Sequence, residues 1–301
     1  MAPLSLDLCG AEVLWNGKFE ARDISLQDGV IASSSGGRAV DLSGYLVLPG
    51  IVDVHGDAFE RQLAPRRGVV TDLRPGLRAL DAELAASGIT TAMLAQFWSW
   101  EGGMRSPEFA RRLLASLFDA KETLNTDMRV QLRFETHLID DYAEFAETVS
   151  EFGVGYVVFN DHLPHRALEL GKRPPRLTGQ ALKSGRSPEA HLEHLQRLHG
   201  RTQDVGPALA RLIPTLLENG VLLGSHDDPT VESRAQWNDH GVRIAEFPET
   251  LEVALAAKQQ GNCIVLGAPN AVRGGSHTGK LSARDVVAEG LCDALASDYH
   301  Y

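Results

Sequence analysis

The chain has 301 residues, of which 43% are hydrophobic and 23% charged, the composition of an ordinary globular protein. Its net charge of -11 argues against a general nucleic-acid binder, and no apolar run approaches the length that spans a bilayer. The N-terminus lacks a signal-peptide pattern, and the three cysteines lie far apart without a CxxC pair. We therefore expect a cytoplasmic enzyme without a disulfide framework or a cysteine-type zinc site, and with neither nucleic acid nor membrane as a partner.

Residues 1–48 contain short β-rich runs separated by turn signals. Asn16-Gly17 follows one such run, and Gln27-Asp28-Gly29 separates two others. Both sequences are typical of tight β-hairpin turns. This stretch therefore predicts a small β-sandwich module, too small to bury a full core alone.

Residues 49–301 alternate between β-rich runs and helical patterns, the latter including 109–124, 208–219 and 251–260. The strand candidates are 51–54, 90–95, 129–134, 156–160, 221–224, 243–247, 264–267 and 294–297. Such alternation predicts βαβ units, and eight strands predict an α/β fold of the closed (β/α)8 TIM-like barrel type. The Pro-, Gly- and Arg-rich stretch 165–187 predicts a long loop or lid at the barrel mouth. Because no eighth helix follows, we expect the C-terminal part of the domain to be missing or truncated.

Side chains that bind metals follow several of these strand candidates. His55 and Asp57 come first, and their spacing of two aims both side chains to the same side. The later strand ends add Glu135, His162, His226 and Asp298. Because the carboxyl ends of barrel strands meet at one mouth, these residues predict a site for two divalent ions bridged by Glu135. The mixture of imidazoles and carboxylates favours zinc, with manganese or iron as alternatives.

This ligand set predicts hydrolysis, because two cations that bridge a water lower its pKa and supply hydroxide near neutral pH. Asp298, at the metal edge, is the candidate base that takes the proton from this water. The ligand set alone does not distinguish hydrolysis at a carbonyl centre from hydrolysis at a phosphoryl centre. Taken singly, a histidine after a strand is more often a loop or cap residue, and Asp227 and Asp228 are also suited to capping the next helix.

Basic residues gather in the expected mouth loops of this acidic chain. The glycine-rich segment 273–280 follows the seventh strand candidate, where barrels often bind phosphate. His277 in this segment is a candidate general acid for the leaving group or a donor to phosphate. The candidate phosphate-binding residues are Arg273, Ser276, His277 and Lys280, with Arg66 and Arg67 after the first strand and Lys172, Arg173 and Arg176 in the long loop. Each group also fits an ordinary exposed loop.

Together these residues resemble the amidohydrolase superfamily along the whole chain. Most members carry His-x-His at the first strand and many bridge their metals with a carbamylated lysine, whereas this chain has Asp57 and Glu135 at those places. With these departures, the chain resembles the branch of the superfamily that acts on ribosyl triphosphates in phosphonate use. The matching segments are 55–57, 224–228, 244–250, 267–279 and 297–299.

The resemblance implies a metal-dependent diphosphatase of phosphonate catabolism. It would cleave alpha-D-ribose 1-methylphosphonate 5-triphosphate to the 5-phosphate and diphosphate by water attack on the α-phosphorus, so the expected partner is a small phosphorylated substrate. A C–N hydrolase, such as a deacetylase or cyclic amidase, is the alternative on the same two metals. A third reading is a non-enzymatic assembly protein, against which the retained ligands argue. A homodimer is compatible with the barrel, because many barrel enzymes pair through their outer helices.

Overall fold

The structure is a computed structural model that describes residues 4–34, 36–64, 72–275 and 281–301. The backbone contacts divide the chain into two compact units, Met1–Ile51 and Val52–Tyr301. No helix in the described part of the chain is long and apolar enough to cross a membrane.

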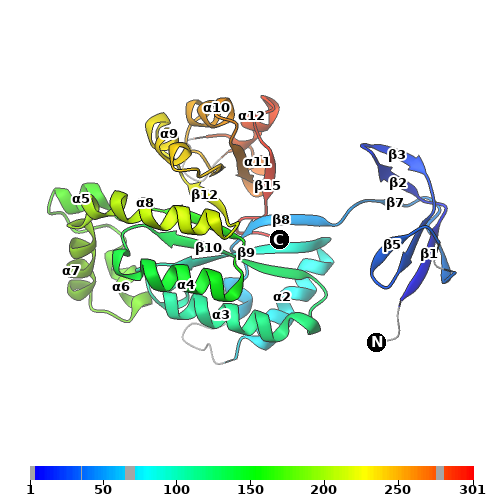
Figure 1. Cartoon of the computed structure of the whole chain (residues 1–301), viewed down its shortest axis with the longest axis horizontal. Helices are drawn as coiled ribbons and strands as arrows, with labels where there is room; N and C mark the ends of the chain where they lie inside the picture. Colours follow the sequence, from blue (N-terminus) through cyan, green and yellow to red (C-terminus); the bar gives the residue numbers. More distant parts are fainter. Residues whose placement is uncertain (1–3, 35, 65–71, 276–280) are drawn as a thin grey trace. The chain divides into compact units, whose positions relative to one another are not determined.

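The N-terminal unit consists of two small sheets (Figure 1). One has the order β5 (Val30–Ala32), β4 (Ile24–Gln27), β1 (Ser5–Cys9), β6 (Arg38–Asp41), and the other has the order β3 (Lys18–Ala21), β2 (Glu12–Trp15), β7 (Leu46–Val47). Both expected hairpins form, and Asn16 and Gly17 have φ of 49° and 79° as a type I′ turn requires. The expected small β module is therefore confirmed.

The second unit is built on one eight-stranded sheet in which the strands follow one another in chain order. The strands are β8 (Ile51–Gly56), β9 (Ile89–Trp98), β10 (Asp127–Glu135), β11 (Tyr156–Asn160), β12 (Leu222–His226), β13 (Ile244–Glu246), β14 (Cys263–Gly267) and β15 (Ala294–Ala296). Neighbours from β9 to β15 pair in parallel, and a parallel bridge between Gly56 and Asp298 joins the two edges of the sheet. All eight predicted strands and the nearly closed TIM-like barrel are confirmed.

Helices fill the connections between these strands, and α2, α3 and α4 lie beside β9 and β10 (Figure 1). Their start signals are local: Ser106 caps α3 through the Phe109 N–H, and proline follows it at the first helical position. The α-helices are α1 (Glu60–Leu63), α2 (Arg74–Ala86), α3 (Pro107–Ala120), α4 (Tyr142–Phe152), α5 (His165–Glu169), α6 (Leu177–Ser184), α7 (Pro188–His199), α8 (Thr202–Glu218), α9 (Val231–Asp239), α10 (Leu251–Gln259), α11 (Ala268–Arg273) and α12 (Ala283–Ala288). The three predicted helices correspond to α3, α8 and α10.

The prediction of one long loop at 165–187 is wrong. This stretch contains α5 and α6, and Leu168, Leu177 and Ala181 are buried. Leu177 and Ala181 are four residues apart, so both lie on one face of α6. Most of the prolines and glycines that suggested a loop stand outside the helices, Gly185 with φ of 69° ends α6, and Gly179 lies within α6.

Strand β10 explains why polar side chains converge inside the barrel. Val130, Leu132 and Phe134 belong to the hydrophobic core, whereas the alternate residues contact side chains on β12 and β13 or just after β11. Successive side chains of a strand point to opposite faces. One face of β10 therefore packs on the core, and the other carries Gln131, Arg133 and Glu135 into the barrel.

Candidate active site

Glu246, the last residue of β13, joins two histidines at the centre of the barrel. Its side chain is fully buried, and its Oε2 lies 2.8 Å from His55 Nδ1 and 3.3 Å from His226 Nδ1. Tyr156 and Gln131 donate to Oε1 at 2.7 and 2.5 Å. Burial opposes ionisation of Glu246, but His55 and the hydrogen bonds outweigh it and keep its pKa well below the ordinary value. The carboxylate therefore orients both imidazoles through their Nδ1 atoms.

This arrangement leaves a nitrogen of His55 without a hydrogen bond. His55 Nε2 is buried and has no hydrogen-bond partner among the described residues. Because the Nδ1 proton is donated to Glu246, Nε2 carries a lone pair. A buried acceptor of this kind needs a partner, and a histidine whose other nitrogen donates to a carboxylate is typical of metal sites. The residues present therefore fit a divalent cation.

Glu135 and His162 form a second pair of carboxylate and imidazole. His162 Nδ1 lies 2.5 Å from Glu135 Oε1, and Trp100 Nε1 donates to Oε2 at 3.2 Å. Burial disfavours both charges, but their attraction outweighs it, so the pKa of Glu135 is lowered and that of His162 raised. Both oxygens of Glu135 are thus engaged inside the protein, and its role as a bridge between metals stays a prediction.

His226 connects the two groups. One donor atom from each of His162, His226 and Asp227 lies within 4.8 Å of the others, as do donor atoms of His55, His226 and Glu246. Arg133 approaches His226 Nε2 to 2.8 Å. A cation on that nitrogen therefore requires this hydrogen bond to be given up.

Asp227 and Asp228 do not cap the next helix, which was the alternative to a role in the site. Thr230 caps α9 through the Ser233 N–H, and Asp228 is buried against Arg234 and Ser225 at 3.1 and 2.7 Å. Asp227 has φ of 57° and faces His226. Asp227 is therefore a further donor beside the predicted set.

The edges of the sheet bring Asp57 and Asp298 together. The Asp57 N–H donates to the Asp298 carbonyl at 2.8 Å, and the Asp298 N–H donates to the His55 carbonyl at 2.9 Å. Asp53, which is buried, accepts from the Ser297 N–H and hydroxyl at 2.8 and 2.6 Å. We call these contacts the seam. It places two of the predicted ligands at the same end of the barrel as His55.

A cavity of about 490 Å³ opens at the carboxyl ends of the strands, and we call it the mouth cavity. Five of its lining residues carry possible metal donors: Asp57, His226, Asp227, Glu249 and Asp298. Three others are arginines: Arg105, Arg133 and Arg176. The cavity thus combines metal-binding side chains with three cationic groups suited to phosphate oxygens.

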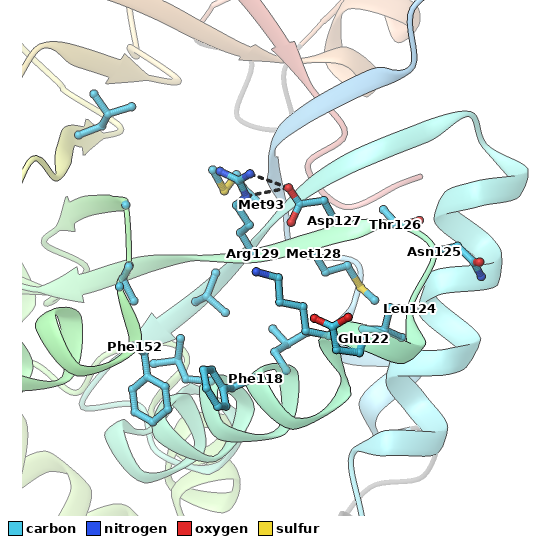
Figure 2. A pocket seen from close by; sticks show the side chains of 18 residues that line it. Met93, Phe118, Glu122, Leu124, Asn125, Thr126, Asp127, Met128, Arg129 and Phe152 are labelled. Carbon is cyan, nitrogen blue, oxygen red and sulfur yellow. Dashed lines mark hydrogen bonds and ion pairs between the residues drawn. The ribbon is translucent and has the colours of Figure 1, made fainter. Parts of the chain in front are cut away.

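A larger cavity of about 740 Å³ lies at the amino ends of β10, β11 and β12, and we call it the amino-end cavity. Figure 2 shows Phe118 and Phe152 on one side of it and the paired side chains of Asp127 and Arg129 on another. Arg129 Nε lies 2.9 Å from Asp127 Oδ2. The other ionisable side chains that line the amino-end cavity, among the described residues, are Lys121 and Glu122.

The predicted phosphate-binding residues are only partly described. Arg273 ends α11 and donates to Asn270 Oδ1 at 3.1 Å and to the Tyr299 hydroxyl. Because Asn270 lines the mouth cavity, Arg273 lies near its rim. Arg176 lines the mouth cavity, whereas Lys172 and Arg173 are exposed and do not line it. The remaining predicted residues lie outside the described residues: Arg66, Arg67, Ser276, His277 and Lys280.

Sequence reasoning missed Glu246, Arg133 and Arg105. Glu246 gave the same signal as Glu135, a carboxylate at the end of a β-rich run. Arg133 stands two residues before Glu135, so strand alternation could have assigned it to the same face. Arg105 is the last residue of the short 3₁₀ helix Gly103–Arg105 after β9 and offered no comparable signal.

The comparisons with known proteins agree with this geometry. No protein-family model matches the chain. The chain is 30% identical over 265 residues to the alpha-D-ribose 1-methylphosphonate 5-triphosphate diphosphatase of Escherichia coli (strain K12), a match that covers 87% of this chain and 70% of that protein.

Two solved structures share the fold. An uncharacterised metal-dependent hydrolase from Pyrococcus furiosus has a TM-score of 0.57 at 10% identity, covering 97% of this chain and 85% of that one. A beta-aspartyl dipeptidase from Fervidobacterium islandicum AW-1 has a TM-score of 0.51 at 14% identity, covering 98% and 72%. The chain therefore belongs to the family of the Escherichia coli diphosphatase, within the amidohydrolase superfamily of metal-dependent hydrolases.

Proposed function

We propose that this hydrolase cleaves alpha-D-ribose 1-methylphosphonate 5-triphosphate to the 5-phosphate and diphosphate. The observation that carries the proposal is the lining of the mouth cavity, where Arg105, Arg133 and Arg176 stand beside Asp57 and the other donors. A net charge of -11 makes such a concentration of arginines unexpected without an anionic ligand. The name of the 30% identical relative supports the same substrate.

We further propose two divalent ions, zinc in preference to manganese or iron. His55, His162 and His226 would hold them together with Asp57, Asp298 and Glu135, while Glu246 orients two of the imidazoles. When bound, such ions would polarise a phosphoryl oxygen and lower the pKa of a nearby water.

The chain's own residues would then position the triphosphate and move the proton. Asp298 accepts the proton of the attacking water. The water oxygen forms a bond to the α-phosphorus, the bond from that phosphorus to the bridging oxygen breaks, and diphosphate leaves. Arg105 is held by Glu101 at 3.0 Å, so its guanidinium is already oriented at the cavity wall.

Phosphorus NMR of the reaction with this ribosyl triphosphate tests the proposal directly. We expect equal amounts of diphosphate and the ribosyl 5-phosphate. Release of inorganic monophosphate would contradict attack at the α-phosphorus. Amide or cyclic-amide hydrolysis without turnover of the triphosphate would instead favour C–N bond cleavage on the same scaffold.

A further inference from the structure

A second group of donors lies beside the barrel centre but uses different residues. His137 follows β10, Asp161 follows β11, His165 begins α5 and His199 ends α7. His165 Nε2 lies 2.9 Å from both oxygens of Asp161, and His137 Nδ1 lies 3.4 Å from Asp161 Oδ1. One donor atom from each of His137, Asp161 and His165 lies within 4.8 Å of the others.

The hydrogen bonds of Thr202 determine the tautomer of His137. The Thr202 hydroxyl donates to the His199 carbonyl at 2.7 Å, so its oxygen accepts from His137 Nε2 at 3.2 Å. Nε2 therefore carries the proton, and Nδ1 of the neutral ring has a lone pair. His137 is only 3% exposed, so its ring nitrogens depend on partners inside the protein.

The lone pair of His137 Nδ1 consequently points to a carboxylate rather than to a donor. Nδ1 is buried and has no hydrogen-bond partner among the described residues. Two acceptors 3.4 Å apart repel each other unless a cation or a proton lies between them. A cation would satisfy His137 Nδ1 and both neighbouring donors together.

His165 has the second partner that metal-binding histidines usually have. Its Nδ1 lies 2.8 Å from His199 Nδ1, which fixes the ring while Nε2 faces Asp161. Side-chain exposures of 28% for His165 and 42% for Asp161 leave one side of the group open to water. Two imidazoles, one carboxylate and an open position are a common donor set for zinc and related ions.

We propose that His137, Asp161 and His165 bind a divalent cation of the zinc type, at a site separate from the barrel-centre donors. Thr202 and His199 are its positioning residues. The bound ion connects the residues after β10 and β11 with the start of α5. Because Asp161 directly precedes His162, the ion also restrains the backbone that presents His162 to Glu135.

Anomalous scattering from a crystal of the wild-type chain, grown with zinc and measured on both sides of the zinc edge, tests the site. We expect a peak at about 2.0–2.2 Å from His137 Nδ1, His165 Nε2 and an Asp161 oxygen. Peaks at the barrel centre without one at this group would overturn the proposal. A peak at this group alone would support it and count separately against the barrel-centre ions.

Metal content gives an independent measurement. After zinc loading and removal of free metal, His165→Gln should contain about one ion fewer per chain than the wild type. His240→Gln, which changes an exposed histidine at the end of α9, is the matched control and should keep the full content. Equal zinc content in His165→Gln and His240→Gln would reject the site.

Discussion

The two cavities at opposite ends of the barrel strands differ in a way that volume does not reveal. The amino-end cavity is the larger, at about 740 Å³ against about 490 Å³ for the mouth cavity. Yet its charged pair, Asp127 and Arg129, is internally satisfied. At the mouth, histidines and carboxylates from distant strands meet around buried, incompletely satisfied atoms. We therefore place the proposed chemistry at the carboxyl strand ends, as in other barrel enzymes, and not in the larger of the two cavities.

Both regions contain an aspartate, a glutamate and an arginine, which allows matched substitutions. Asp298 and Arg176 line the mouth cavity, and Glu246 is buried at the end of β13 beside His226, which also lines it. Asp127, Glu122 and Arg129 line the amino-end cavity. Equal effects within any pair would remove the distinction between the cavities.

Asp298→Asn should have the largest effect. We expect kcat to fall by about 10²–10⁴ because the base for the attacking water is lost. Asparagine tolerates the φ of 57° at this position, so the backbone part of the seam should persist and metal content should remain mostly intact. Steady-state kinetics and elemental analysis measure both quantities. Asp127→Asn should keep wild-type turnover, and unchanged turnover in Asp298→Asn would refute the assigned role.

Glu246→Gln should mainly weaken metal binding. The substitution removes the negative charge that orients His55 and His226, and loss of such a partner typically weakens metal affinity by roughly 10–100-fold. Competition with a coloured chelator measures the affinity. Glu122→Gln is the control at the amino end. If both variants bind zinc as the wild type does, Glu246 does not support the metal centre.

Arg176→Gln should have a smaller effect, on KM more than on kcat. Loss of one charged hydrogen bond of about 1.5 kcal/mol corresponds to roughly tenfold in binding, and solvent screening reduces this for an exposed side chain. The effect should appear with the ribosyl triphosphate and shrink at high salt. Arg129→Gln should leave KM unchanged. A KM shift of the same size in both variants would indicate a general charge effect and not a local clamp.

The pH dependence of stability provides the smallest effect and a common baseline. Burial, followed by the charges of Arg186 and Arg197, lowers the pKa of His194 to about 4, from 6.5 in the unfolded chain. As the pH falls from 6.5 towards 4, the unfolded chain therefore binds a proton that the folded chain excludes, and the free energy of unfolding decreases.

Urea unfolding at pH 7 and pH 5 tests this expectation. The decrease should be shallower in His194→Gln than in the wild type. Because His194 lines neither cavity, variants at both ends of the barrel should share the wild-type slope. The same slope in wild type and His194→Gln would show that this histidine does not contribute.

The strands were predictable because each is a short β-rich run whose residues are mostly apolar. Longer helices such as α3 were predictable because their apolar residues, here at positions 109, 113 and 117, lie on one face. The helices of the stretch 165–187 were not predictable. Its prolines and glycines obscured the four-residue spacing between Leu177 and Ala181, which is typical of one face of a helix. Composition is a poor guide where helices are only one or two turns long.

The candidate site was predictable only up to the strand ends. The order of the strands brings His55 and His226 to one mouth, as expected from a closed barrel. Glu246 shares the local signal of Glu135, but its role depends on a contact with His55, which is 191 residues away in the chain. Such a contact requires the register between strands, and no local pattern contains it. The roles of the individual ligands stay predictions.

The seam has a consequence for how a newly made chain matures. Asp53 and Ser297 are 244 residues apart. The contacts between β8 and the residues after β15 can therefore form only after nearly all of the barrel strands have been synthesised. Until residue 298 has left the ribosome, His55 and Asp57 lack Asp298, the last of the proposed donors in the chain. We therefore expect the proposed metal site at the mouth to be completed only when the barrel closes.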